Sequence, residues 1–214
     1  MTDARGQGRP RRSDGEVGRD RLLEMACAAM SARPRTDIQR QEIAKAAGVT
    51  PALVSYYYPD KWQLLESAAR PVIEDYVAQI RFLLNSQDDP VETLKKLTLF
   101  YINFNRRHGF VLEYYLEAVA RREARADATL LNEAYAEILA FFDANIRAKR
   151  LRDCDAALLQ STLWGVCKYI ANLSDPQQAH PLSIDGDPEA GRRQADLVCD
   201  LLLNGILMPP SAAP

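Results

Sequence analysis

The stretch that most constrains the fold is residues 39–65, QRQEIAKAAGVTPALVSYYYPDKWQLL. Its first half, around Ile43, has the apolar spacing of a short helix, and Gly48 then permits the positive φ that a sharp chain reversal requires. Thr50 stands where an N-cap stands, and Pro51 takes the first helical position, where its missing N–H costs no hydrogen bond. The stretch therefore predicts two short helices joined by a tight turn.

The rest of the chain also has a helical pattern. Apolar residues within 22–30 recur at helical spacing, Pro34 ends that first helix, and no segment alternates with period two for long enough to predict a strand. We therefore expect an all-α fold. The further helices are expected at about 39–46, 50–58, 60–69, 71–86, 89–107, 110–124, 127–149, 154–174 and 189–207.

The length of 214 residues suits one large domain or two unequal ones. We expect a flexible basic arm over 1–18, a helix-turn-helix domain over 19–66, a larger helical domain over 67–208 and a tail over 209–214. Residues 1–61 carry a net charge of +3 and the remainder a net charge of −5, which is typical of one nucleic-acid-facing end. A solvated basic tail explains the charge alone equally well.

Composition excludes several classes of protein. No apolar run approaches the roughly 18–20 residues that span a bilayer, and the first residues lack a secretory signal. The four cysteines are scattered without a C-x-x-C pair, which favours reduced thiols over a disulfide frame or a zinc site. We expect a cytoplasmic protein that needs no cofactor.

Residues 21–65 contain the features Ile43-Ala44, Ala47-Gly48-Val49-Thr50, Tyr56-Tyr57-Tyr58, Asp60-Lys61 and Leu64-Leu65. With these features they resemble the DNA-binding domain of the TetR/AcrR family of helix-turn-helix transcriptional regulators. This resemblance implies a palindromic operator and a C-terminal helical domain for ligand binding and dimerisation. A repressor released by a small-molecule effector is the usual form. The sequence departs from the family pattern at Gln39, Arg40, Ser55 and residues 32–34.

The resemblance also implies DNA contacts. The N-terminal part of the second helix would read base edges, Tyr57 and Lys61 would bind phosphates, and the arginines of the arm would enter the minor groove. Tyr56 and Tyr57 could instead pack on the first helix, and Leu53 and Tyr58 are expected in the core. The expected DNA-binding residues are Arg9, Arg11, Arg12, Gln39, Thr50, Pro51, Ala52, Ser55, Tyr56, Tyr57 and Lys61.

The larger domain is rich in aromatic residues at helical spacing, for which a core is the default interpretation. Polar side chains interleave with them, as they do in a mostly apolar small-molecule site. The expected ligand-binding residues are Phe104, Phe110, Tyr114, Glu117, Trp164 and Lys168.

The helices at 154–174 and 189–207 have more apolar surface than one packing partner would cover. They are expected to form a homodimer interface, which would set two reading helices about 34 Å apart. The helix at 60–69 would link this domain to the DNA-binding part. The apolar residues concerned are Leu158, Leu159, Leu163, Val166, Ile170, Leu197, Val198, Leu201 and Leu202, with small residues at Ala157, Ser161, Gly165 and Ala195.

Two other classes of protein compete with this hypothesis. An all-helical enzyme could use Cys167 or His108, but the sequence contains no catalytic triad pattern, metal cluster or glycine-rich phosphate loop. We therefore expect no enzymatic turnover. A nucleoid-type or ligand-storage protein would lack the preference for one palindrome that a regulator has.

Overall fold

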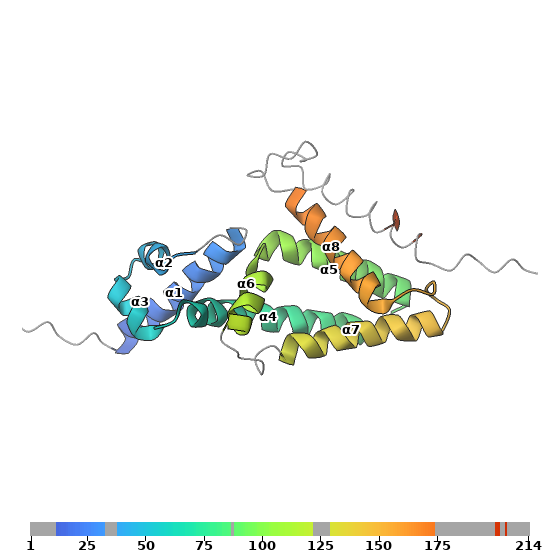
Figure 1. Cartoon of the computed structure of the whole chain (residues 1–214), viewed down its shortest axis with the longest axis horizontal. Coiled ribbons are helices and arrows are strands. Elements are labelled where there is room, and N and C mark those ends of the chain that lie inside the picture. Colours follow the sequence, from blue (N-terminus) through green and yellow to red (C-terminus); the bar gives the residue numbers. More distant parts are fainter. Residues whose placement is uncertain are drawn as a thin grey trace, which may run out of the picture.

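The structure is a computed structural model that describes residues 12–32, 38–86, 88–121, 129–173, 200, 201 and 204. Side chains are described from Gly18 in the first helix and up to Ala171 in the last one. These parts of the chain form helices and no strand, which confirms the all-α prediction (Figure 1). In order, the helices are α1 (Arg12–Ala32), α2 (Arg40–Ala47), α3 (Pro51–Tyr57), α4 (Lys61–Leu84), α5 (Pro90–His108), α6 (Val111–Arg121), α7 (Thr129–Arg147) and α8 (Ala156–Leu173).

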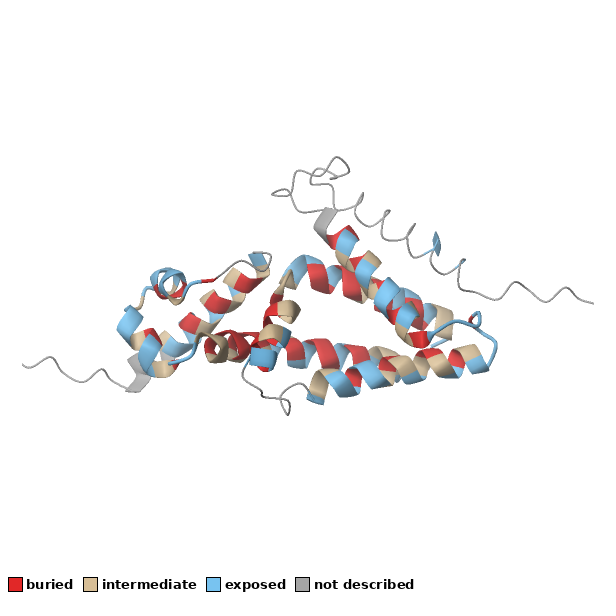
Figure 2. Cartoon of the chain, in the orientation of Figure 1, coloured by how far each residue is buried: buried red, intermediate tan, exposed pale blue. Residues whose placement is uncertain are grey.

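Two apolar cores lie along the molecule (Figures 1 and 2). The first joins α1, α2 and α3 to the beginning of α4, and it also contains buried residues of α6 such as Tyr115. The second joins the later part of α4, from Tyr76 onward, to α5, α7 and α8. Helix α4 therefore contributes to both cores, and α6 packs against α4. None of the described helices is long and apolar enough to cross a membrane.

The predicted break near residue 70 is wrong, because α4 continues unbroken from Lys61 to Leu84 with Pro71 inside it. A proline inside a helix leaves the carbonyl four residues earlier, here that of Ser67, without its helical N–H partner. Pro71 itself is exposed, whereas Ala69 and Ile73 beside it are buried. The helix persists because burial on its inner face outweighs one lost hydrogen bond.

The start of the first helix also differs from the prediction. Residues 12–18 belong to α1, not to a flexible arm. No proline lies between Arg12 and Ala32, and the glycines at 15 and 18 weaken a helix by about 1 kcal/mol each without ending it. Residues 1–11 and 205–214 lie outside the described residues, as does the predicted helix at 189–207 except for residues 200, 201 and 204.

Candidate functional site

Helices α2 and α3 are joined by the tight turn that the sequence predicts. Gly48 has a φ of 70°, in the left-handed region, and its N–H bonds back to the end of α2. No atom lies within 4 Å of the place where a Cβ would be, so the backbone conformation rather than space favours glycine there. Thr50 caps α3, since its hydroxyl accepts a hydrogen bond from the Leu53 N–H at 3.2 Å. The turn at Gly48 and the cap at Thr50 both confirm what the sequence predicted.

The side chains of α3 divide between the core and solvent. Val54 and Tyr58 are buried, as expected for Tyr58, and Leu53 is half-buried. Tyr56 is 78% exposed, and its ring lies edge-on to that of Tyr57 at 5.3 Å between centroids. Among the described residues expected to face DNA, Tyr57 and Lys61 are half-buried. The exposed ones are Gln39, Thr50, Pro51, Ala52, Ser55 and Tyr56.

This exposed face carries side chains of types that can bind DNA. Hydroxyl and amide groups hydrogen-bond to base edges and phosphates, while Ala52 and Pro51 offer small apolar surface to a thymine methyl. Of the expected arm residues, Arg9 and Arg11 lie outside the described residues, and only the backbone of Arg12 is described.

Two arginines that the sequence did not single out as functional hold α3 in place. Arg40 Nη1 donates to the carbonyl oxygen of Pro59 at 2.7 Å and lies 3.4 Å from that of Tyr58. Arg19 Nε donates to the Tyr58 hydroxyl at 3.2 Å, and this hydrogen bond raises the pKa of Arg19. The end of α3 is thereby attached to α1 and to α2. The only sequence signal was that Arg40 departs from the apolar residue common at its position.

The N-terminus of α4 lies beside this surface. Asp60 caps the helix by accepting the N–H groups of Trp62 at 3.1 Å and Gln63 at 3.3 Å. The Trp62 ring contacts two cations, the Lys61 amine at 4.6 Å and the Arg121 guanidinium at 4.5 Å. Arg121 is the last residue of α6, so the stack joins the α4 terminus to α6.

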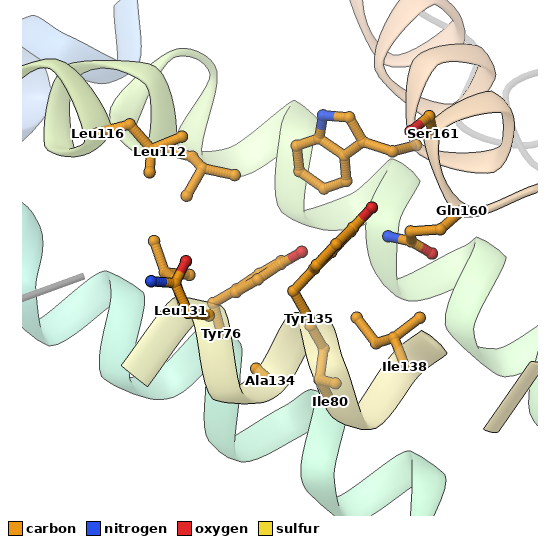
Figure 3. Close-up of a pocket in the computed structure, with 12 residues that line it drawn as sticks. Tyr76, Ile80, Leu112, Leu116, Leu131, Ala134, Tyr135, Ile138, Gln160 and Ser161 are labelled. Atoms are coloured by element: carbon orange, nitrogen blue, oxygen red, sulfur yellow. The ribbon is translucent and has the colours of Figure 1, made fainter. Parts of the chain in front are cut away.

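A cavity of about 290 Å³ lies between α4, α6, α7 and α8 (Figure 3). Its inner residues, including Ile80 and Ile138, are buried, and Tyr135 and Leu116 are partly exposed at its edge. Of the six predicted ligand-binding residues, only Trp164 lines it. The lining consists of Tyr76, Ile80, Leu112, Leu116, Leu131, Asn132, Ala134, Tyr135, Ile138, Gln160, Ser161 and Trp164.

The other five predicted residues are not part of this lining. Phe104 packs on Tyr76 with 4.6 Å between ring centroids, and Tyr114 is buried in the core that contains α1 to α3. Glu117 pairs with Arg121 at 2.8 Å. Helical spacing placed these residues on an inward face, but it could not say which neighbouring helix that face meets.

Lys168 and Phe110 belong to a separate contact between α6 and α8. Lys168 forms an ion pair with Glu113, and its amine lies 5.3 Å from the centre of the Phe110 ring. Burial lowers the pKa of Lys168. This cluster fixes α6 against α8, close to the cavity but not in its lining.

One hydrogen-bonded network borders the cavity. Gln160 Nε2 donates to the Tyr101 hydroxyl at 3.0 Å, and the hydroxyls of Tyr101 and Tyr76 are also hydrogen-bonded to each other. Burial raises the pKa of both tyrosines well above their usual range, so both stay neutral at physiological pH. Nothing in the sequence separated Tyr76 and Tyr135 from the other aromatic residues.

The comparisons with known proteins bear on the fold. No protein-family model matches the chain, and no curated protein matches it in sequence. Among solved structures, a TetR family transcription regulator from Marinobacter aquaeolei VT8 has a TM-score of 0.65 at 17% identity, over 93% of this chain and 100% of its own. The ketosteroid transcriptional regulator KstR2 of Mycobacterium tuberculosis has a TM-score of 0.67 at 17% identity, over 89% and 95%.

A third similar structure is the TetR family regulator PfmR from Thermus thermophilus, with a TM-score of 0.62 at 17% identity, over 85% of this chain and 98% of its own. These similarities extend over nearly the whole of each chain, so they include the larger helical domain as well as the helix-turn-helix. The chain has the fold of the TetR family of transcription regulators.

Proposed function

We propose that this protein is a DNA-binding transcription regulator of the TetR family and not an enzyme. The observation that carries the proposal is the exposed face of α3, which follows a glycine turn, is capped by Thr50 and presents Ser55 and Tyr56 to solvent. A helix presented in this way enters the major groove of DNA. The +3 net charge of residues 1–61 suits a polyanionic partner.

In this proposal, two classes of contact act together on the DNA. Residues of α3 from Thr50 to Tyr56 read base edges, whereas Tyr57 and Lys61 bind phosphates beside the N-terminus of α4. Gln39 at the start of α2 and the arginines at 9, 11 and 12 add contacts to the flanking backbone or minor groove. Arg40 and Arg19 do not contact DNA in this scheme but orient α3.

A homodimer would present two copies of α3 to a palindromic operator. The outer face of α8 supports this arrangement, because it carries Leu158 and Tyr169 in exposed positions, with small exposed residues at Thr162 and Gly165 between them. Leu163 and Ile170, which the sequence suggested for the interface, are instead buried within the protomer. The interface therefore uses the other side of α8, with residues 189–207 as a further candidate part.

Regulation would depend on α4, which has residues in both cores and lines the cavity through Tyr76 and Ile80. A ligand that binds better to an arrangement unsuited to DNA shifts the population away from the operator, with a typical coupling of about 1–3 kcal/mol. We infer that an effector in the cavity changes DNA binding, because the cavity lies beside the helix that begins at the DNA-facing surface. The resemblance to the TetR/AcrR family favours a repressor that the effector releases.

The proposal is tested by selecting sites from random DNA with the purified protein. We expect enrichment of a palindrome, bound in preference to unrelated DNA at a salt concentration that abolishes non-specific binding. Lys61→Gln should weaken binding to all sequences and reduce the salt dependence by about one phosphate contact. Gln79→Ala, at an exposed position of α4, is the control. Selection without any enriched sequence would contradict the proposal.

A further inference from the structure

Among the described residues that line the cavity, the tyrosines are the only ones with an ionisable side chain. Its walls are aliphatic at Ile80, Ala134 and Ile138 and aromatic at Tyr76 and Trp164. Transfer of an ionised group from water into such surroundings costs several kcal/mol unless a counter-charge is present. The lining therefore selects for a neutral molecule.

One buried polar group in this wall has incomplete hydrogen bonding. Gln160 is 5% exposed, and its Nε2 is bonded to Tyr101. Its Oε1 is buried and has no hydrogen-bond partner in the described part of the chain. A buried acceptor without a partner costs about 1–3 kcal/mol, so a ligand hydrogen-bonding group is favoured once the amide turns this enclosed oxygen toward the cavity. The Gln160 side chain reaches from α8 toward Tyr135 at the edge of the cavity (Figure 3).

A hydroxyl group fits this position better than an ether or a carbonyl. It donates to the amide oxygen of Gln160, and if the amide turns over it accepts from the amide nitrogen. The hydrogen bond between Gln160 and Tyr101, together with the one between Tyr101 and Tyr76, holds the amide at the wall before a ligand arrives.

The aromatic walls indicate the rest of the ligand. The rings of Tyr76 and Trp164 lie 6.0 Å apart at an angle of 81°, which leaves two differently oriented aromatic surfaces beside the cavity. Rings pack on such surfaces in stacked or edge-on arrangements. The volume of about 290 Å³ accommodates a fused two-ring molecule.

We propose that the cavity binds a neutral, ring-containing alcohol or phenol whose hydroxyl pairs with the Gln160 amide. This inference rests on the proposed function, because it gives the chemical class of the effector. It is tested without DNA by equilibrium dialysis of the full chain against three probes: 2-naphthol, 2-methoxynaphthalene and 2-naphthoate. The probes share one ring system and differ in the hydrogen-bond donor and in charge.

We expect 2-naphthol to bind about three- to tenfold more tightly than the ether, which lacks the donor. It should bind at least about tenfold more tightly than the carboxylate, which has no counter-charge. Gln160→Leu should remove the preference for the alcohol over the ether, whereas Gln79→Leu, at an exposed position outside the lining, should retain it. Ala134→Leu should fill the cavity and weaken binding of all three probes.

The proposal is overturned if the ether or the carboxylate binds the wild-type protein as tightly as 2-naphthol. It is also overturned if no probe binds below about 1 mM. The three-probe comparison uses wild-type protein, so it decides the question even if Gln160→Leu does not fold. Binding of 2-naphthol by a protein that selects no DNA site would contradict the regulator and leave the ligand class intact. Selection of a DNA site by a protein that binds none of the three probes would contradict the ligand class alone.

Discussion

At the scale of single residues, the orientation of α3 depends on polar contacts at its C-terminal end. The Tyr58 side chain is buried, its hydroxyl accepts from Arg19, and the carbonyls of Tyr58 and Pro59 face Arg40. These bonds join residues 18 to 39 positions apart in the chain. They position the helix that presents Ser55 and Tyr56 without themselves lying on the exposed face.

Arg40→Ala should therefore reduce both stability and DNA binding. The loss of its hydrogen bonds to two carbonyls is expected to lower the free energy of unfolding by about 1 kcal/mol. Urea denaturation and a DNA-binding titration measure the two effects. Arg21→Ala is the control, because Arg21 has an exposed pair with Glu24 that should contribute less than about 1 kcal/mol. Equal effects of the two variants would refute the role given to Arg40.

His108, at the end of α5, should make stability depend on pH. Partial burial, followed by the charge of Arg107, lowers the pKa of His108 below 6.5, and Asp75 opposes this shift. Between the folded-state pKa and 6.5 the unfolded chain binds more protons, so the free energy of unfolding rises with pH in that window and levels off above it. Urea titrations at several pH values measure this rise. His108→Gln should remove it, and an unchanged profile would contradict this assignment.

At the scale of elements, α4 is the unusual helix because it crosses from one core to the other with a proline inside. Its first part packs with Val54 of α3 and Leu22 of α1, and its later part lines the cavity through Ile80. A helix that stays continuous between two such sites transmits a rotation or translation from one to the other. Pro71 weakens its backbone where the two parts meet.

Pro71→Ala should stabilise the protein, because it restores an N–H that can bond to the Ser67 carbonyl. The expected gain in the free energy of unfolding is about 1 kcal/mol or more, after the entropy that proline removes from the unfolded chain is subtracted. Thermal and urea denaturation measure it. Ala78→Pro, at an exposed position of the same helix, should instead destabilise by about 3 kcal/mol. A loss of stability in Pro71→Ala would mean that proline is required there.

At the scale of the whole molecule, the outer face of α8 and the exposed Phe82 on α4 provide a matched comparison. Leu158 is 67% exposed and Phe82 is 72% exposed, but only Leu158 lies on the proposed dimer face. A charge placed in an apolar interface opposes association because it loses its hydration there.

Leu158→Glu should therefore convert the dimer into monomers of 24.0 kDa and weaken operator binding, while Phe82→Glu should leave the dimer intact. Sedimentation velocity measures the mass, and far-UV circular dichroism verifies that both variants stay helical. A dimer that persists in Leu158→Glu would place the interface elsewhere. Dissociation of Phe82→Glu would show that α4 contributes to it.

Local features were predictable from the sequence because the interactions that produce them span only a few residues. The turn at Gly48 and the cap at Thr50 are of this kind, and each agrees with the structure. The break expected at Pro71 was wrong because local propensity favours a stop there, and packing on the far side of the helix outweighs it.

The helical class, the helix-turn-helix and the inward placement of most aromatic residues follow from the sequence alone. Which helix faces meet depends on the tertiary fold, and so does the finding that Trp164 and Gln160 border the cavity while Tyr114 and Lys168 do not. The tertiary fold also decides which side of α8 stays exposed. The physical reason is that helical periodicity separates inside from outside, whereas the choice of partner depends on contacts between residues far apart in the chain.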